Sequence, residues 1–400
     1  GVAATHVVQR ASECIYIGPR VDLFAQSLLR GEVVGRAEHL LVVRHGQRVL
    51  VLLVEEAGEP HVENLHDAVL VHEQVRGLHV AVNEAGIVGV PEAVGRLADV
   101  LDGLREVERI HGEMHAIMQQ VGFEGSLQDF FEYTRNGDQF FYTSREEYIA
   151  DAQAKIDALG KKMPEFFGTL PTDPLTIKAV EAFREQSAGK AFYQRPAPDG
   201  SRPGTYYVNL YNLRDMSKNE LEALAYHEGI PGHHMQRAIA QELDGVPQFQ
   251  KFLSFTAYTE GWGLYTEELA KDMGFYQDPY SDFGRLAMEL WRACRLVVDT
   301  GIHAKKWSRE KAVDYLIENT PNPEYDAQKA IERYIAMPGQ ATAYMIGKLK
   351  IMELREMAQN ELGDKFDWKG FHDEVLKYGP VPLSILEENV NAWIASQKSA

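Results

Sequence analysis

The spacing of apolar residues becomes helical at Val107 and stays helical through most of the remaining chain. Serine precedes several of these segments, where its side chain can accept a hydrogen bond from the first helical turn. A proline-containing stretch at residues 320–323 interrupts the pattern. The pattern predicts a mainly α fold with few strands, and with helices at residues 126–133, 144–159, 282–299, 308–318 and 340–362.

The first 103 residues have a different composition. They are rich in valine, arginine and histidine, and the first lysine of the whole chain is Lys155. Short apolar runs predict strands at residues 40–43 and 49–54, and residues 91–104 have a helical pattern. We interpret residues 1–103 as an atypical segment of uncertain fold, either a small α/β piece or sequence from a wrong reading frame. Residues 104–400 are then one large helical domain.

The most informative local pattern begins at His227 and reads His-Glu-Gly-Ile-Pro-Gly-His-His. Ser217 and Glu220 form a capping-box pattern that predicts the start of its helix. Zinc peptidases commonly carry two histidines four residues apart on one helical face, with a glutamate after the first. Here the fourth residue after His227 is Pro231, which cannot bind a metal.

The second histidine of such a site must therefore be His233 or His234. On a straight helix His234 would share the face of His227 but lie about 10 Å further along the axis. Zinc holds each imidazole nitrogen at about 2.0–2.1 Å, so the helix must bulge or unwind at residues 229–232. Glycine and proline permit such a break. We predict His233 as the ligand, with His234 as an alternative ligand or a group beside the site.

Two glutamates complete the predicted zinc site. Glu228 follows the first histidine, where a carboxylate can take a proton from metal-activated water. Glu260 lies on a later helix between glycine and aromatic residues and is the predicted third ligand. Glu267 and Glu268 have the pattern of solvated helix positions. The alternative interpretation of the motif is a polar helix with surface histidines.

Several sequence segments resemble those of bacterial domain-of-unknown-function family 885, whose members are predicted zinc metallopeptidases. The similarity covers roughly residues 104–397. It implies a mainly helical peptidase fold, distantly similar to the thermostable carboxypeptidase and angiotensin-converting enzyme groups. It also implies His227, His233 and Glu260 as metal ligands and Glu228 as the base. The segments that carry the resemblance include residues 227–236, 121–127, 141–148, 198–204, 207–209, 259–262, 292–303, 338–341 and 371–373.

Candidate substrate-binding residues lie outside the metal motif. Residues 204–210 predict a strand before the motif helix, and an edge strand there would pair with a substrate backbone. Residues 164–199 are punctuated by proline and are expected to wind over the surface. Tyr344 is the candidate donor to the carbonyl oxygen of the reacting amide. The other candidates are Tyr207, Asn209 and Gln340 as substrate contacts, and Arg292, Arg295, Arg333 and Lys348 as clamps for a carboxylate.

Composition narrows the function classes. The formal net charge of −18 disfavours nucleic acid as a partner, and no run of 18 apolar residues predicts a membrane span. Cys14 and Cys294 are too few for a disulfide framework, and Cys294 is expected to be a buried thiol. The absence of a leader segment favours the cytoplasm.

Together these patterns predict a Zn²⁺-dependent hydrolase that cleaves amide bonds, most simply a peptidase acting on small peptides. One alternative is a zinc amidase or deacylase that acts on a non-peptide amide. The other is a non-catalytic protein that uses the metal site for interaction. Glu228 argues against the second alternative, because a structural site fills its fourth position and needs no base.

Overall fold

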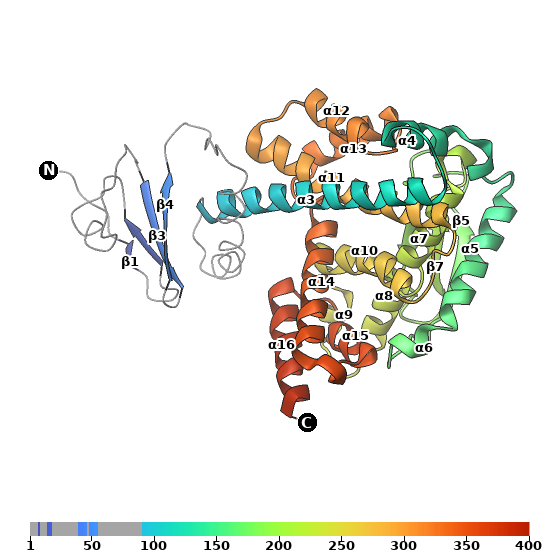
Figure 1. Cartoon of the computed structure of the whole chain (residues 1–400). Coiled ribbons are helices and arrows are strands. Elements are labelled where there is room, and N and C mark those ends of the chain that lie inside the picture. The colour runs from blue at the N-terminus through green and yellow to red at the C-terminus, as the bar shows by residue number, and fades with distance from the viewer. Residues whose placement is uncertain (1–6, 9–13, 18–38, 46–47, 55–89, 400) are drawn as a thin grey trace. The chain divides into compact units, whose positions relative to one another are not determined.

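The computed structural model describes residues 7–8, 14–17, 39–45, 48–54 and 90–399 (Figure 1). The chain divides into two compact units, residues 1–98 and 99–400. The division lies a few residues before the predicted boundary at residue 103. It falls inside helix α3 (Val90–Gln120), which continues well beyond the predicted helix at residues 91–104.

The described part of the first unit is an antiparallel sheet in the order β1-β2-β3-β4. The predicted strands at residues 40–43 and 49–54 are confirmed, because they fall within β3 and β4. These two strands pair so that Val42 lies opposite Val51. The strands are β1 (Val7–Val8), β2 (Cys14–Ile17), β3 (His39–His45) and β4 (Arg48–Val54).

The second unit is mainly helical, as predicted, and every predicted helix between residues 126 and 362 is present within one to three residues at most ends. Ser126 and Ser308 accept hydrogen bonds from the helices that they precede. The helices after α3 are α4 (Leu127–Asn136), α5 (Arg145–Gly160), α6 (Met163–Phe166), α7 (Lys218–Glu228), α8 (His233–Glu242), α9 (Gln248–Phe252), α10 (Thr256–Asp272), α11 (Pro279–Lys305), α12 (Arg309–Asn319), α13 (Glu324–Ala336), α14 (Ala343–Leu362), α15 (Trp368–Leu376) and α16 (Leu383–Ser399).

Helix α10 occupies the centre of this unit, in contact with α7, α8, α11 and α14 (Figure 1). Its contact with α14 is unusually close because glycines face each other there. A side chain at Gly261 would overlap the backbone of Gly347, and one at Gly347 would overlap the carbonyl oxygen of Ala257. Helices α7 and α11 approach in the same way, where Gly284 lies against the backbone of Asn219. Small residues therefore set the spacing of the four helices that surround the site.

A three-stranded sheet in the order β5-β7-β6 lies beside α5, α7 and α8. Strand β7 (Gly204–Val208) pairs in parallel with β5 (Leu175–Ala179) and antiparallel with β6 (Ala191–Gln194). Residues 164–199 lie mostly at the surface, as expected, but they also contain part of α6 and the strands β5 and β6, which were not predicted. Pro174 stands directly before β5 and Pro196 lies after β6, so the prolines bound the strands without interrupting them.

The expected role of residues 207–209 as an edge strand is wrong. Strand β7 is the central strand of the sheet, so both sides of its backbone are paired. The Tyr207 ring is buried and stacks on Phe192 with ring centroids 5.0 Å apart. The edge strand next to the cavity described below is β6, which sequence analysis did not identify.

The glycine contact between α10 and α14 gives a test of the packing. We expect Gly347→Ala to lower the free energy of unfolding by about 1–3 kcal/mol, because the new methyl group overlaps backbone atoms that cannot move independently. Gly112→Ala is the matched control, since Gly112 is exposed on α3 with open space around it. That change should raise stability by about 0.4–1 kcal/mol. Urea unfolding of both variants measures the difference, and a Gly347→Ala protein that is as stable as the unchanged protein would contradict the packing.

Candidate metal centre

His227 and Glu228 are the last two residues of α7. Ser217 caps this helix by accepting a hydrogen bond from the Asn219 N–H, but the reciprocal half of the predicted capping box is absent. Glu220 instead accepts from the Lys190 ammonium group at 3.0 Å. The helix start is therefore confirmed, while Glu220 is used for a longer-range ion pair.

The helix is interrupted at residues 229–232, as the zinc hypothesis requires. The Ile230–Pro231 peptide is cis, and α8 begins at His233. Gly232 lies so close to the carbonyl oxygen of His227 that a side chain there would overlap it. The indole N–H of Trp262 on α10 donates to the Pro231 carbonyl at 2.8 Å. The break is thus fixed both by a glycine that has no room for a side chain and by a buried hydrogen bond.

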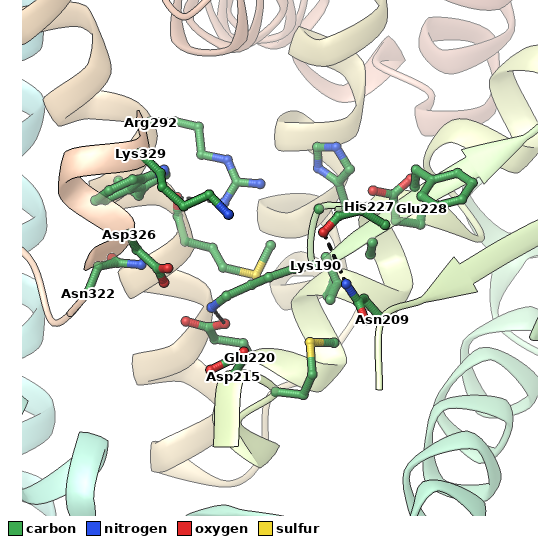
Figure 2. Close-up of a pocket in the computed structure, with 18 of the residues that line it drawn as sticks. Lys190, Asn209, Asp215, Glu220, His227, Glu228, Arg292, Asn322, Asp326 and Lys329 are labelled. Carbon is green, nitrogen blue, oxygen red and sulfur yellow. Dashed lines mark hydrogen bonds and ion pairs between the residues drawn. The ribbon is translucent and has the colours of Figure 1, made fainter. Parts of the chain in front are cut away.

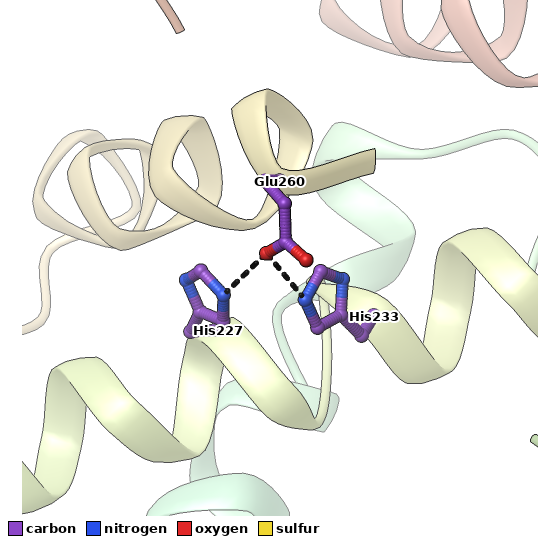
Figure 3. A group of neighbouring side chains, drawn as sticks. All are labelled: His227, His233 and Glu260. Atoms are coloured by element: carbon purple, nitrogen blue, oxygen red, sulfur yellow. Dashed lines mark ion pairs between the residues drawn. The ribbon is translucent and has the colours of Figure 1, made fainter. Parts of the chain in front are cut away.

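This break brings His227 and His233 together below Glu260 (Figure 3). The Nε2 atoms of His227 and His233 lie 3.7 and 3.3 Å from Oε2 of Glu260, and the three candidate ligand atoms lie within 4.8 Å of one another. The two rings are nearly perpendicular, with centroids 4.6 Å apart. Two nitrogens and one carboxylate oxygen converge on a single point, which is a donor set suited to a divalent metal ion.

His234 lies outside this group. Its Nε2 is 3.0 Å from the Asp173 carbonyl oxygen, so Nε2 carries the proton and donates. The Tyr193 hydroxyl then donates to Nδ1 at 2.9 Å. Burial lowers the pKa of His234 to about 4, which keeps the ring neutral. Both ring nitrogens are occupied, so His234 fixes Tyr193 of β6 beside the site and is not placed to act as a third imidazole ligand.

Glu267 is the main residue that sequence analysis missed. It is 1% exposed, and its Oε1 accepts a hydrogen bond from Nδ1 of His227 at 2.7 Å. The expectation that Glu267 is solvated is therefore wrong. Its position seven residues after Glu260 would have placed both glutamates on one face of α10. A carboxylate on the far nitrogen of a metal-binding histidine fixes its tautomer and orientation.

Gly263 lies between these two glutamates on the same helix. A side chain there would approach the Cε1 and Nε2 atoms of His227 to 2.7 and 2.8 Å. The absence of a side chain therefore lets the His227 ring lie flat against α10. In this position its two nitrogens can face Glu260 and Glu267.

The electrostatics of the group favour a bound cation. Burial lowers the pKa of His227, but the carboxylates of Glu260 and Glu267 outweigh burial and raise that pKa to about 10. Burial likewise opposes ionisation of Glu260, yet the two histidines hold its pKa well below the usual range. Without a metal ion, the group therefore retains a proton between its rings and carboxylates. A divalent ion would compete with that proton for the same nitrogen atoms.

The group opens onto a cavity of about 870 Å³ (Figure 2). Glu228 lines it, and Oε2 of this buried carboxylate has no hydrogen-bond partner among the described residues. Figure 2 shows Lys190 directed to Glu220, with Arg292 and Lys329 on another side of the cavity. Tyr344, Asn209 and Arg333 also line the cavity, whereas Tyr207 and Gln340 do not.

Residues 101–390 match the family described as "Bacterial protein of unknown function (DUF885)". The chain belongs to this family. A solved structure described as "the putative lipoprotein from Colwellia psychrerythraea" is 41% identical, with a TM-score of 0.74 over 75% of this chain and 52% of that one. A second, described as "a putative lipoprotein of unknown function from Shewanella oneidensis", is 21% identical, with a TM-score of 0.64 over 73% and 56% of the two chains, and shows the fold alone.

This DUF885 chain spans about half the length of those two proteins. None of the curated proteins matches it. Among the described residues, no helix is both long and apolar enough to cross a membrane. The cytoplasmic location stays a prediction.

The other residues that were predicted to contact substrate differ in whether the structure leaves them available. Asn209 donates to the carbonyl oxygens of Glu185 and Ala188, so its amide supports the cavity wall. Arg333 donates to Gln340 at 2.9 Å. The prediction that Lys348 is a carboxylate clamp is wrong: Lys348 is 2% exposed and pairs with Glu268 at 2.5 Å and with Glu289.

The expectation that Cys294 is buried is confirmed, and it is a free thiol on α11. Trp262 is also fully buried, where its indole holds the helix break. Neither residue offers an atom to the group of candidate ligands.

The link between Glu267 and His227 is testable in chelated, metal-free protein. We expect Glu267→Gln to lower the pKa of His227 by about one unit or more, because one of the two carboxylates that stabilise the charged ring is lost. Proton NMR of the histidine ring as a function of pH measures this shift.

Glu268→Gln is the matched control, because the neighbouring carboxylate pairs with Lys348 and makes no contact with His227. It should leave the His227 titration unchanged. An unchanged titration in Glu267→Gln would show that this hydrogen bond does not control the ring.

Proposed function

We propose that this protein is a zinc-dependent hydrolase that cleaves amide bonds, with small peptides as substrates. The observation that carries the proposal is the convergence of His227, His233 and Glu260 at the wall of a cavity, beside the unpartnered carboxylate of Glu228. Three protein ligands leave a fourth coordination position open, as in catalytic zinc sites. A bound zinc ion would polarise the substrate carbonyl and lower the pKa of a water molecule.

The residues around the metal position have distinct roles in this proposal. Glu228 is buried and lines the cavity, and its Oε2 has no hydrogen-bond partner among the described residues, so the carboxylate is available to accept a proton from the attacking water. The same carboxyl group then donates that proton to the leaving nitrogen. Glu267 holds the His227 ring so that Nε2 faces the metal position.

A peptide substrate is supported by the strand at the cavity. Ala191, Phe192 and Tyr193 of β6 line the cavity, and within the described sheet β6 pairs on one side only, with β7. An extended peptide can add to such a strand through backbone hydrogen bonds. This backbone pairing favours a peptide over a non-peptide amide.

Tyr344 is the proposed donor to the carbonyl oxygen. It lines the same cavity as Glu228 and Glu260, is half-buried, and lies at the start of α14. A hydroxyl donor at this position would stabilise the negative charge that develops on the oxygen during attack.

The metal assignment predicts one zinc ion per chain. His227→Ala, His233→Ala and Glu260→Ala should each lose zinc, because two remaining donors do not hold it. His234→Ala should retain zinc, since that ring contacts Tyr193 and Asp173. His115→Ala, which changes an exposed histidine on α3, is the control. Elemental analysis decides the assignment, and full zinc content in all five variants would refute it.

The role of Glu228 is tested separately from metal binding. Glu228→Gln keeps the size of the side chain and removes the base, so zinc content should be unchanged while turnover falls by about 10²–10⁴-fold. Cleavage of a peptide library, followed by mass spectrometry with and without a chelator, provides the assay. Zinc binding without cleavage of any peptide would leave the amidase or the non-catalytic alternative.

Tyr344→Phe tests the oxyanion donor. We expect kcat to fall by about 10²–10³-fold, because the hydroxyl would act in the transition state. The KM and the zinc content should change little. Tyr378→Phe, on the partly exposed Tyr378 outside the cavity lining, is the control. Normal turnover in Tyr344→Phe would limit this tyrosine to packing against the arginines described below.

A further inference from the structure

Two arginines project from one face of α11 into the lining of the cavity. Arg292 and Arg295 are three residues apart, so their side chains lie on neighbouring positions of the same helical face. The ring of Tyr344 lies 5.8 Å from the guanidinium carbon of Arg292 and 4.7 Å from that of Arg295. The proposed oxyanion donor and both arginines therefore form one cluster.

Arg295 has no carboxylate partner among the described residues. Its guanidinium group packs over Tyr344 and, at 5.8 Å, over Tyr334, and its Nε atom is buried without a hydrogen-bond partner. Its guanidinium group also interacts with the hydroxyls of these two tyrosines, but neither hydroxyl offers the paired oxygens of a carboxylate. A charged group in such a place is costly unless an anion binds to it.

Arg292 is also only partly satisfied. Its Nη1 donates to the Met288 carbonyl at 2.9 Å, and its Nη2 lies 4.0 Å from Oε1 of Glu267, which is too far for a hydrogen bond. Its Nε atom is buried and has no hydrogen-bond partner in the part of the chain that the structure describes. The side chain is 12% exposed, so water can satisfy little of this donor capacity.

The arginine cluster lies close to the proposed metal position. Glu267 lies between the metal ligands and the arginines. Its Oε1 accepts a hydrogen bond from His227 at 2.7 Å and lies 4.0 Å from Arg292. An anion held by the two arginines would thus be separated from the metal ligands by little more than one side chain. This separation suits a substrate whose negative group is near the bond to be cleaved.

Most other cations of the cavity are less suited to this role. Lys190 already pairs with Glu220 at 3.0 Å. Lys329 and Arg333 are exposed, and Arg333 donates to Gln340. Among the described residues that line the cavity, Arg237 on α8 is the one comparable cation, since its Nε atom is also buried without a partner. The test therefore includes an Arg237→Gln variant.

We infer that Arg295, with Arg292 beside it, binds the free carboxylate at the carboxyl end of a peptide. Two guanidinium groups can give a carboxylate several charge-assisted hydrogen bonds, whereas an amidated end offers them no negative charge. The inference rests on the proposed hydrolase function and makes the protein an enzyme that removes residues from the carboxyl end of peptides.

The test measures binding rather than cleavage. A pool of N-acetylated tripeptides of mixed sequence is made once as free acids and once as carboxamides. Both pools are mixed with zinc-treated Glu228→Gln full-length protein, and retained peptides are counted by ultrafiltration and mass spectrometry. We expect the free acids to be retained about 10- to 100-fold more strongly than their amides.

Variants in the same background assign that preference to residues. Arg295→Gln should abolish it, Arg292→Gln should reduce it, and Arg295→Lys should restore part of it, because the charge is kept while the planar fork is lost. Arg309→Gln is the control, since this exposed arginine pairs with Glu332 outside the cavity lining. Circular dichroism of each variant confirms folding.

The outcomes separate this inference from the proposed function. Equal retention of the two pools, or retention of neither, overturns the carboxylate site even if the wild-type protein cleaves peptides. Loss of the preference in Arg237→Gln but not in Arg295→Gln overturns the assignment to α11. A preference that depends on Arg295, in a protein that cleaves nothing and binds no zinc, supports the carboxylate site and refutes the hydrolase.

Discussion

The break between α7 and α8 is the constraint on which the candidate site depends. An uninterrupted helix would place His233 on a different face from His227, and no metal ion could contact both rings. Gly232 allows the chain to pass against the His227 carbonyl, and the Trp262 indole holds Pro231 from the neighbouring helix. Three features of the chain therefore act together: a glycine without space for a side chain, a proline whose carbonyl is held, and a buried tryptophan from a distant segment.

Helix α10 then organises almost everything around that break. Over one face it presents Glu260 to both histidines, Gly263 to the His227 ring and Glu267 to the far nitrogen of that ring. Its opposite contacts with α14 are close because Gly261 meets Gly347. The rigidity of this packing matters, because a metal site tolerates displacements of only a few tenths of an ångström in its ligands.

Charge is distributed unevenly around the cavity. The wall near α7 and α10 carries the glutamates of the candidate centre, while α11 contributes Arg292 and Arg295, which pack over Tyr344; among the described residues, Arg295 has no carboxylate partner and Arg292 has only Glu267 at 4.0 Å. In a site screened from water, each of these charges acts more strongly than it would on the surface. In the proposed function, the arginines would pair with the anionic end of a peptide and its amide would lie at the glutamates.

Local rules were sufficient for much of the fold. Helical periodicity and serine caps located many of the helices after Ser126, such as α4, α5, α11, α12 and α14, because those signals depend on neighbours within one or two turns. The motif that begins at His227 also limited the candidate metal ligands to a few residues. Only a break at the glycines and proline could bring a second histidine close enough to His227 to share a metal ion. The β strands among the prolines were missed, because proline marks a boundary without saying what lies on either side.

Other features required the tertiary structure. Glu267 and Glu268 are adjacent and chemically identical, yet one contacts His227 and the other Lys348. Lys348 and Arg295 were both candidates to bind a substrate carboxylate. Of the two, only Lys348 forms an ion pair with a buried glutamate among the described residues. The sequence by itself determined many of the helices, the need for a break and the identity of the candidate metal ligands. Only the packing of distant helices decided which of those charged groups are paired, because burial and charge pairing depend on neighbours that are far apart in the chain.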